Sequence, residues 1–190
     1  EHAEDLEEFT SITFGEEQEF SKKDTIVVGG MVTRIVKRFD RRNREMAFFD
    51  LDCLGGHAEV IAFSDCFKSY GNLIEEGNVV FVKGKPSENT DFSDLKIMGD
   101  EIIPVDRVRD RLSQRLNIKF PHGETTPEDV DKLMAIAKQY PGECRLVFHL
   151  PNNGSPRPMK VMAHNIKIST DKEFVRLLRT KYGKDNVWVE

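Results

Sequence analysis

Basic side chains gather between residues 34 and 45 of this 190-residue chain, just before a pair of phenylalanines. Six bases stand there against two acids, Asp40 and Glu45, and the bases are Arg34, Lys37, Arg38, Arg41, Arg42 and Arg44. Phe48 follows, and Lys83 and Lys85 add two further bases. Lys and Arg bind phosphates, and an aromatic ring that stacks on an unpaired base contributes about 1 to 3 kcal/mol. These residues are the candidate contacts for a nucleic-acid strand.

The segment 46–51 predicts a strand in which Phe48 faces outward. Alternation places Ala47, Phe49 and Leu51 on one wholly apolar face, which suits a barrel interior. Phe48 is then the candidate stacking ring. Two alternatives stay open: both phenylalanines are buried, or the basic segment is only a solvated turn.

Other chemistry has little support. Asp50 and Asp52 share a strand face, as metal-binding carboxylates do, but no third carboxylate or glycine-rich phosphate loop accompanies them. The histidines lack a Ser or Cys partner in a recognisable motif; they are His2, His57, His122, His149 and His164. We therefore expect no catalytic residue, no metal site and no cofactor in this chain.

The cysteines and the hydropathy bear on the compartment. Cys53, Cys66 and Cys144 are widely spaced, with no CxxC pair, so we expect buried, reduced thiols and a cytoplasmic protein. The sequence contains no apolar run of the roughly 18 residues that cross a membrane, and we expect no membrane partner.

Charge is unevenly distributed along the chain. The net charge is −5, yet residues 1–20 carry eight acids and no Lys or Arg. We expect residues 1–22 to be a solvated acidic connector, without an element of its own, to upstream domains that this sequence lacks. A sharper hypothesis is that this leader competes with nucleic acid for the basic segment.

Five strands and one helix are predicted to position the candidate contacts. The strands are expected at 25–39, 46–51, 58–63, 79–85 and 95–105, with a polar loop at 86–93. Gly29-Gly30 bends the first strand, and the turn at 40–44 joins it to the second. Ser64 caps a short helix that buries Phe67, Tyr70 and Leu73. A helix between the third and fourth strands is typical of the OB-fold, a small Greek-key barrel, here at 23–105.

A charged helical linker at 106–115 leads to a second domain at 116–190. Strands are expected at 116–120, 145–150, 159–163 and 187–189, around a loop at 151–158. Thr126-Pro127 starts one helix with Val130, Leu133, Met134 and Ala137 on its inner face. Thr170 with Glu173 forms a capping box for another helix, which bears Phe174, Leu177 and Leu178 and stops at Gly183. The order β-α-β-β-α-β predicts a split, ferredoxin-like arrangement, so the fold class is α+β.

Several segments resemble the alpha subunit of bacterial DNA polymerase III. Those in the barrel are Gly30-Met31-Val32, Arg44-Glu45-Met46-Ala47-Phe48-Phe49-Asp50-Leu51, Glu59-Val60-Ile61-Ala62-Phe63 and Glu101-Ile102-Ile103-Pro104. Tyr140-Pro141-Gly142-Glu143-Cys144 and Tyr182-Gly183 are similar to that subunit's C-terminal domain. The likeness covers about residues 25–190. The second strand also resembles the anticodon-binding domains of class II tRNA synthetases, so by itself it indicates only the fold.

The resemblance to the polymerase family implies a DNA-directed DNA polymerase as the parent, whose catalytic acids belong to a palm domain absent from this chain. It also implies single-stranded template DNA at the OB domain and the clamp-loader tau subunit at the C-terminal domain. In the family the sliding-clamp motif lies upstream of the OB domain, outside this sequence.

Two alternatives remain. The acidic pI of about 5.6 favours a protein-interaction module in which the barrel is only a scaffold for replisome subunits. An RNA-binding module like the anticodon domains is the other.

Overall fold

The structure is a computed structural model that describes residues 2–15, 21, 23–87, 95–120, 126–151 and 158–190. The acids at 1, 16, 17 and 19, His122, and most of the predicted loops at 86–93 and 151–158 lie outside the described residues. The chain divides into two compact units, Glu1–Val108 and Arg109–Glu190, and the division falls inside the predicted linker. No helix of the described part is long and apolar enough to cross a membrane.

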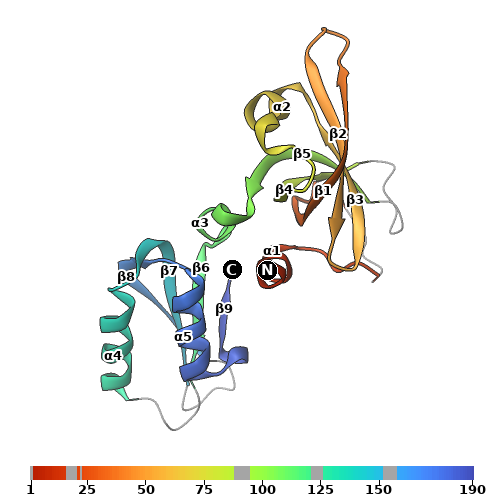
Figure 1. Cartoon of the computed structure of the whole chain (residues 1–190). Helices are drawn as coiled ribbons and strands as arrows, with labels where there is room; N and C mark the ends of the chain where they lie inside the picture. Colours follow the sequence, from red (N-terminus) through yellow and green to blue (C-terminus); the bar gives the residue numbers. More distant parts are fainter. Residues whose placement is uncertain (1, 16–20, 22, 88–94, 121–125, 152–157) are drawn as a thin grey trace. The chain divides into compact units, whose positions relative to one another are not determined.

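The first unit is built on a closed barrel of five strands, and this confirms the predicted OB-type fold (Figure 1). Its strands are β1 (Ile26–Phe39), β2 (Glu45–Cys53), β3 (Gly56–Ala62), β4 (Val79–Pro86) and β5 (Leu95–Pro104). They are bonded in the order β1-β2-β3-β5-β4, with β3 and β5 parallel and β4 returning to β1. The buried core lies inside the barrel and includes Val28, Phe49, Leu51, Val60 and Ile97.

Strand β1 changes neighbours at its glycine pair. Gly30 lies opposite both Cys53 of β2 and Val80 of β4, so the two halves of β1 pair with different strands. A Cβ on Gly30 would stand 2.7 Å from the carbonyl oxygen of Asp52, which only glycine avoids. The predicted bend is therefore the place where the barrel closes.

The helix α2 (Ser64–Tyr70) and the turn η1 (Gly71–Leu73) lie between β3 and β4, as predicted. Phe67, Tyr70 and Leu73 pack against the barrel core. The expected cap is wrong by one position, because Phe63 is the N-cap and Ser64 is the first helical residue. The Ser64 hydroxyl instead donates to the Asp40 carboxylate over 2.9 Å.

The leader has structure of its own, contrary to expectation. Helix α1 (Ala3–Phe9) packs on the barrel, with the Phe9 ring edge-on to Phe81 at 6.3 Å between centroids. After the helix, Ser11 Oγ accepts from the Val27 amide over 2.8 Å. Figure 1 shows α1 at the end of the barrel opposite the turn at 40–44, so the structure gives no support to competition for that turn.

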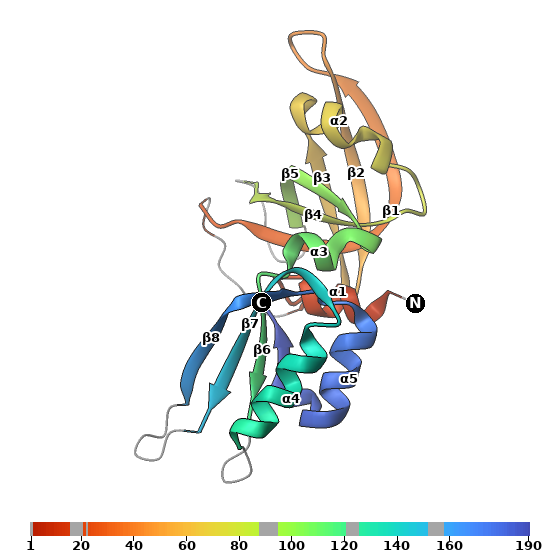
Figure 2. The same ribbon diagram turned by 90° about the vertical axis from the view of Figure 1, so that its left-hand side faces the viewer.

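The second unit is a four-stranded sheet with two helices on one face (Figure 2). The chain enters it through η2 (Val105–Arg107) and α3 (Val108–Leu112). The elements that follow are β6 (Arg115–Lys119), α4 (Pro127–Ala137), β7 (Pro141–Leu150), β8 (Met159–Ile168), α5 (Lys172–Tyr182), η3 (Lys184–Asn186) and β9 (Val187–Val189). The element order β-α-β-β-α-β is as predicted.

The predicted split arrangement is wrong, however. In a split arrangement β8 would lie between β6 and β7. Here β6 and β7 pair directly and in parallel, and the strand order is β8-β7-β6-β9. The cause is burial: Leu146, Val147, Phe148 and His149 of β7 are all buried, so β7 takes a central place. Strand β8 is exposed along most of its length and lies at the edge.

Of the two helix N-caps predicted in this unit, that of α4 is confirmed and that of α5 is wrong. Thr126 caps α4 in a reciprocal capping box with Asp129, and Gly183 ends α5 with φ 94°. Thr170 is not the cap of α5, because Asp171 accepts from the Glu173 amide in its place. Thr170 is buried, and its hydroxyl donates to the Arg109 carbonyl.

Most residues that the sequence places together on one face of α4 or α5 lie in the core of the second unit. The four residues expected on the inner face of α4 belong to the core of this unit, as do Phe174 and Leu178 of α5. Leu177 is 45% exposed, contrary to expectation, and Val175 is buried in its place.

The three cysteines are free and buried, as predicted. Burial raises the pKa of Cys53 to about 12, with a further increase from the Asp52 charge. Burial likewise raises the pKa of Cys66 and of Cys144 to about 11 each. All three thiols therefore stay protonated near neutral pH and behave as small apolar core residues.

Candidate nucleic-acid interface

An apolar row crosses the outer face of the barrel. Strand register places Val36, Phe48, Ile61 and Met98 side by side on β1, β2, β3 and β5. Their neighbours along each strand point inward, as the burial of Ala47, Phe49 and Val60 shows. All four side chains of the row are half-buried, so their outer surfaces form a shallow apolar strip open to a ligand.

Phe48 is the aromatic residue of this row. Phe48 points outward, away from the interior occupied by Phe49, and lies between Val36 and Ile61. It is neither fully exposed nor fully covered. Part of its side chain is thus accessible to a ligand, while the rest is covered by its neighbours.

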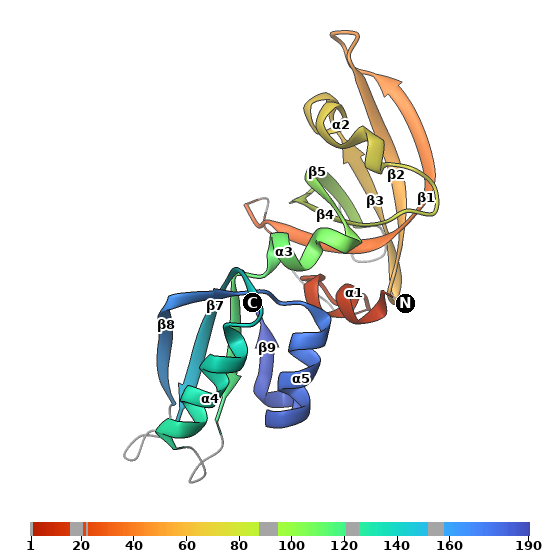
Figure 3. The ribbon, with the colours of Figure 1, turned by 60° about the vertical axis from the view of Figure 1, so that its left-hand side comes forward.

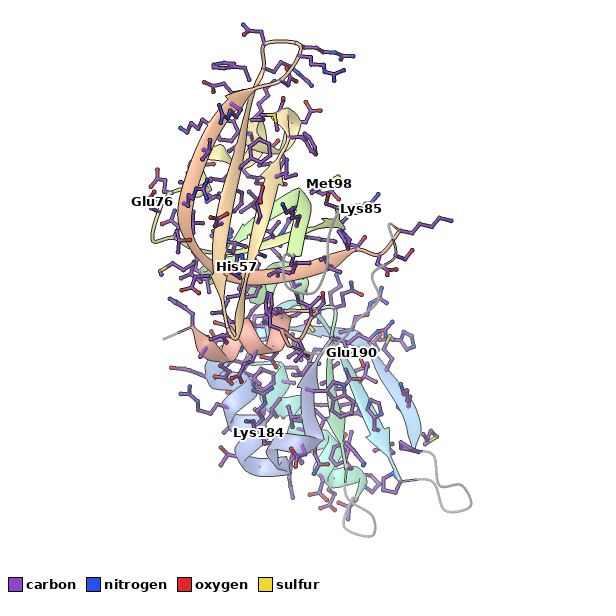
Figure 4. All side chains as sticks on the ribbon, turned by 90° about the vertical axis from the view of Figure 1, so that its right-hand side faces the viewer. His57, Glu76, Lys85, Met98, Lys184 and Glu190 are labelled. Atoms are coloured by element: carbon purple, nitrogen blue, oxygen red, sulfur yellow. The ribbon has the colours of Figure 1, made fainter. Side chains whose placement is uncertain are left out.

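Lys85 continues the row on β4. It lies opposite Met98, and Figure 4 shows the two labelled side chains next to each other. Lys85 is exposed, so an ammonium group stands at the end of the apolar strip. Lys83, two residues earlier, is half-buried and lies opposite Glu101 of β5.

A row of paired charges runs beside the apolar row. Arg34 lies 3.8 Å from the Asp50 carboxylate, and Lys96 lies 3.5 Å from Glu59. Asp50 therefore serves in an ion pair across β1 and β2. These pairs are partly exposed, so they contribute little stability, but they neutralise this side of the strip.

Asp40 holds the turn between β1 and β2 in one shape. Its Oδ1 accepts from the backbone amides of Arg42 and Arg44 over 2.8 and 2.9 Å. Its Oδ2 accepts from Arg44 Nε and from the Ser64 hydroxyl, each over 2.9 Å. The Arg44 amide bond above all, followed by those from Ser64 and Arg42, keeps the pKa of Asp40 well below its ordinary value.

The bases of the turn divide into two kinds. Arg44 is exposed but engaged, because its guanidinium pairs with Asp40 over 2.9 Å and with Asp65 over 3.2 Å. Arg41 and Arg42 are exposed, with no ion-pair partner among the described residues. The turn therefore presents two arginines to solvent on a backbone fixed by Asp40.

The two remaining candidates lie on opposite faces of β1. Arg38 is exposed opposite Met46, on the face that carries the apolar row. Lys37 lies on the other face, with Nζ 5.7 Å from the centre of the Phe67 ring on α2. A cation at that distance is attracted by the ring, so Lys37 is partly engaged within the protein.

Sequence reasoning missed two residues of this region. Phe39, at the end of β1, is 64% exposed, which is unusual for a phenylalanine and makes it a second candidate ring. Its position between Arg38 and the turn was a signal for it. Ser64 was expected to cap a helix, and nothing local in the sequence indicates its contact with Asp40.

Residues 26–105 match a family model described as an OB-fold nucleic acid binding domain, tRNA_anti-codon. The match covers the whole barrel and none of the second unit.

The curated relatives are alpha subunits of DNA polymerase III. The Pseudomonas fluorescens protein is 24% identical over 169 residues, which is 88% of this chain and 14% of that protein. The Borreliella burgdorferi protein is 25% identical over 178 residues, 90% of this chain and 15% of its own length. The chain thus spans about one seventh of these relatives.

Among solved structures, a mitochondrial single-stranded DNA binding protein from S. cerevisiae, Rim1, matches with a TM-score of 0.31 and 12% identity. The match covers 46% of this chain and 95% of that one, and a likeness at this level carries no argument about function. The family model and the curated relatives together show that the chain carries an OB-fold nucleic-acid-binding domain related to the alpha subunit of DNA polymerase III.

Removal of the Asp40 side chain should loosen the turn. In Asp40→Ala the amides of Arg42 and Arg44 lose their acceptor, so we expect their hydrogen exchange to accelerate about tenfold or more. Asp52→Ala is the matched control, because it removes the same charge from an exposed position on β2. It should leave the hydrogen exchange of those two amides unchanged. Equal exchange in the two variants would show that Asp40 does not hold the turn.

Proposed function

We propose that this chain binds single-stranded DNA across the outer face of its barrel, as a non-catalytic part of a replicative DNA polymerase alpha subunit. The observation that carries the proposal is the apolar row from Val36 to Met98, with the exposed Arg38 two residues from Val36 on β1 and the exposed Lys85 opposite Met98 on β4. Nucleobases lie on such a strip, while Arg38, Lys85 and the exposed Arg41 and Arg42 of the turn beyond β1 bind phosphates.

A single strand suits this surface better than a duplex. In a single strand the base faces are free to contact Phe48 and its neighbours, whereas a duplex presents mainly phosphates. The chain as a whole carries a net charge of −5, which disfavours binding driven by phosphate contacts alone.

Arg41→Ala/Arg42→Ala should weaken binding and reduce its salt dependence. With four phosphate contacts, the logarithm of affinity falls with the logarithm of salt with a slope of roughly 3, at about 0.7 per contact. The double variant should lower that slope by about 1.4. The measurement is fluorescence anisotropy of a labelled oligothymidylate at several salt concentrations.

The matched control is Arg107→Ala/Arg176→Ala, which removes the same charge from exposed positions that belong neither to the turn nor to the apolar row. It should leave the affinity nearly unchanged. No binding of single-stranded DNA at low salt would contradict the proposal and favour the alternative in which the barrel is a scaffold. Tighter binding of an RNA strand in the same assay would favour the RNA-binding alternative.

We further propose that the second unit attaches the chain to the clamp-loader tau subunit. The proposal rests on the resemblance to the polymerase family and on relatives whose match extends over 88% and 90% of this chain. Purified tau should co-elute with this chain in size-exclusion chromatography, and Arg41→Ala/Arg42→Ala should co-elute equally well. Separate elution of tau and the wild-type chain at micromolar concentration would contradict it.

A further inference from the structure

The sheet of the second unit has an open face. Helices α4 and α5 pack on the face that carries Leu116, Ile118, Leu146 and Phe148 (Figure 3). Residues that alternate with these point to the other side, where no helix of the described part of this unit lies. We call that side the open face.

A row with an aromatic end crosses the middle of the open face. Register places Trp188, Asn117, Val147 and Met162 side by side on β9, β6, β7 and β8. Trp188 and Met162 are half-buried, while Asn117 and Val147 are buried. The indole ring therefore provides the largest apolar surface of the row.

Basic residues flank this row on both sides. On one side Arg115, Arg145 and Lys167 are neighbours on successive strands. On the other side Lys119 and Lys160 lie on either side of His149. All five Lys and Arg side chains are exposed.

Acidic residues on this face are fewer. Glu190 pairs with Arg115 over 3.3 Å, and Glu143 pairs with Lys167. Arg145, Lys119 and Lys160 have no ion-pair partner among the described residues. The open face is thus net positive, although the chain as a whole is acidic.

Polar groups surround Trp188, and its Nε1 donates to Glu190 Oε1 over 3.3 Å. The His149 ring lies 4.8 Å from the indole between centroids, and His149 Nε2 lies 2.9 Å from Asn117 Oδ1. Asn117 is 2% exposed, and its Nδ2 has no hydrogen-bond partner among the described residues. A buried donor without an acceptor is unfavourable, so Asn117 is a polar weak point beneath this row.

The protonation state of His149 follows from its burial and from the charges around it. Burial lowers the pKa of His149, and the charges of Lys160 and Lys119 lower it further, against an opposing effect of Glu190. His149 is therefore neutral near pH 7, and the positive charge of the face comes from its lysines and arginines.

We infer that the open face is a second binding surface for single-stranded nucleic acid, on which a base stacks on Trp188 and the flanking rows bind phosphates. An aromatic ring between two basic rows on a sheet matches the chemistry of a single strand, which alternates flat apolar bases with anionic phosphates. An acidic protein surface would meet the charges but would give the indole at the end of the row no flat partner. This surface belongs to the second unit, whereas the outer barrel face belongs to the first.

Trp188 itself reports on this inference, because it is the single tryptophan of the chain. Oligothymidylate added to the full chain should quench its fluorescence in a saturable way that salt reverses. Arg145→Ala/Lys160→Ala should weaken the affinity obtained from quenching about tenfold and lower its salt slope by about 1.4. Lys132→Ala/Lys138→Ala, an equal charge change on the exposed side of α4, is the control and should match the wild type.

The same titration in the Arg41→Ala/Arg42→Ala chain separates the two surfaces. Quenching that persists there supports the open face whether or not the barrel binds DNA. An unchanged Trp188 emission, or equal quenching in Arg145→Ala/Lys160→Ala and the wild type, overturns the inference. Unchanged emission would leave an acidic protein surface as the partner of this face.

Discussion

Closure of the barrel through β1 determines where every candidate contact of the first unit lies. Because β1 pairs with β4 from Ile26 to Met31 and with β2 from Gly30 to Phe39, the five strands close into a barrel with one inside and one outside. Once Phe49 and Val60 are committed to the interior, Phe48 and Ile61 must face out. The apolar row is thus a consequence of closure, and a slip of one residue in register would remove it.

Electrostatics then decides which bases remain available. Asp40 engages Arg44 and fixes the turn backbone, and Asp50 engages Arg34 across two strands. Arg41, Arg42 and Arg38 have no such partner among the described residues. The second unit repeats the pattern on a different scaffold, where two acids pair with two basic residues, and three further basic residues have no ion-pair partner among the described residues.

The sequence predicts the barrel well because its signals are local: strand alternation, the Gly29-Gly30 pair and the helix between the third and fourth strands. It fails where the determinant is a distant partner. The hydroxyl of Ser64 contacts Asp40, 24 positions away, and Thr170 contacts Arg109, 61 positions away. The three consecutive apolar residues Leu146, Val147 and Phe148 were a signal for a central place of β7, but element order alone suggested the split arrangement. Which bases of the turn stay free depends on Asp65, which lies on α2.

The most direct test of the barrel as a strand holder is the affinity of Phe48→Leu for oligothymidylate across a salt series, beside Ile61→Leu as the matched control in the same row. Loss of the ring should weaken binding about fivefold or more at every salt concentration and leave the salt slope unchanged, because stacking involves no counterions. Equal affinities of Phe48→Leu and the wild type would show that the outer face does not stack bases and would contradict the account.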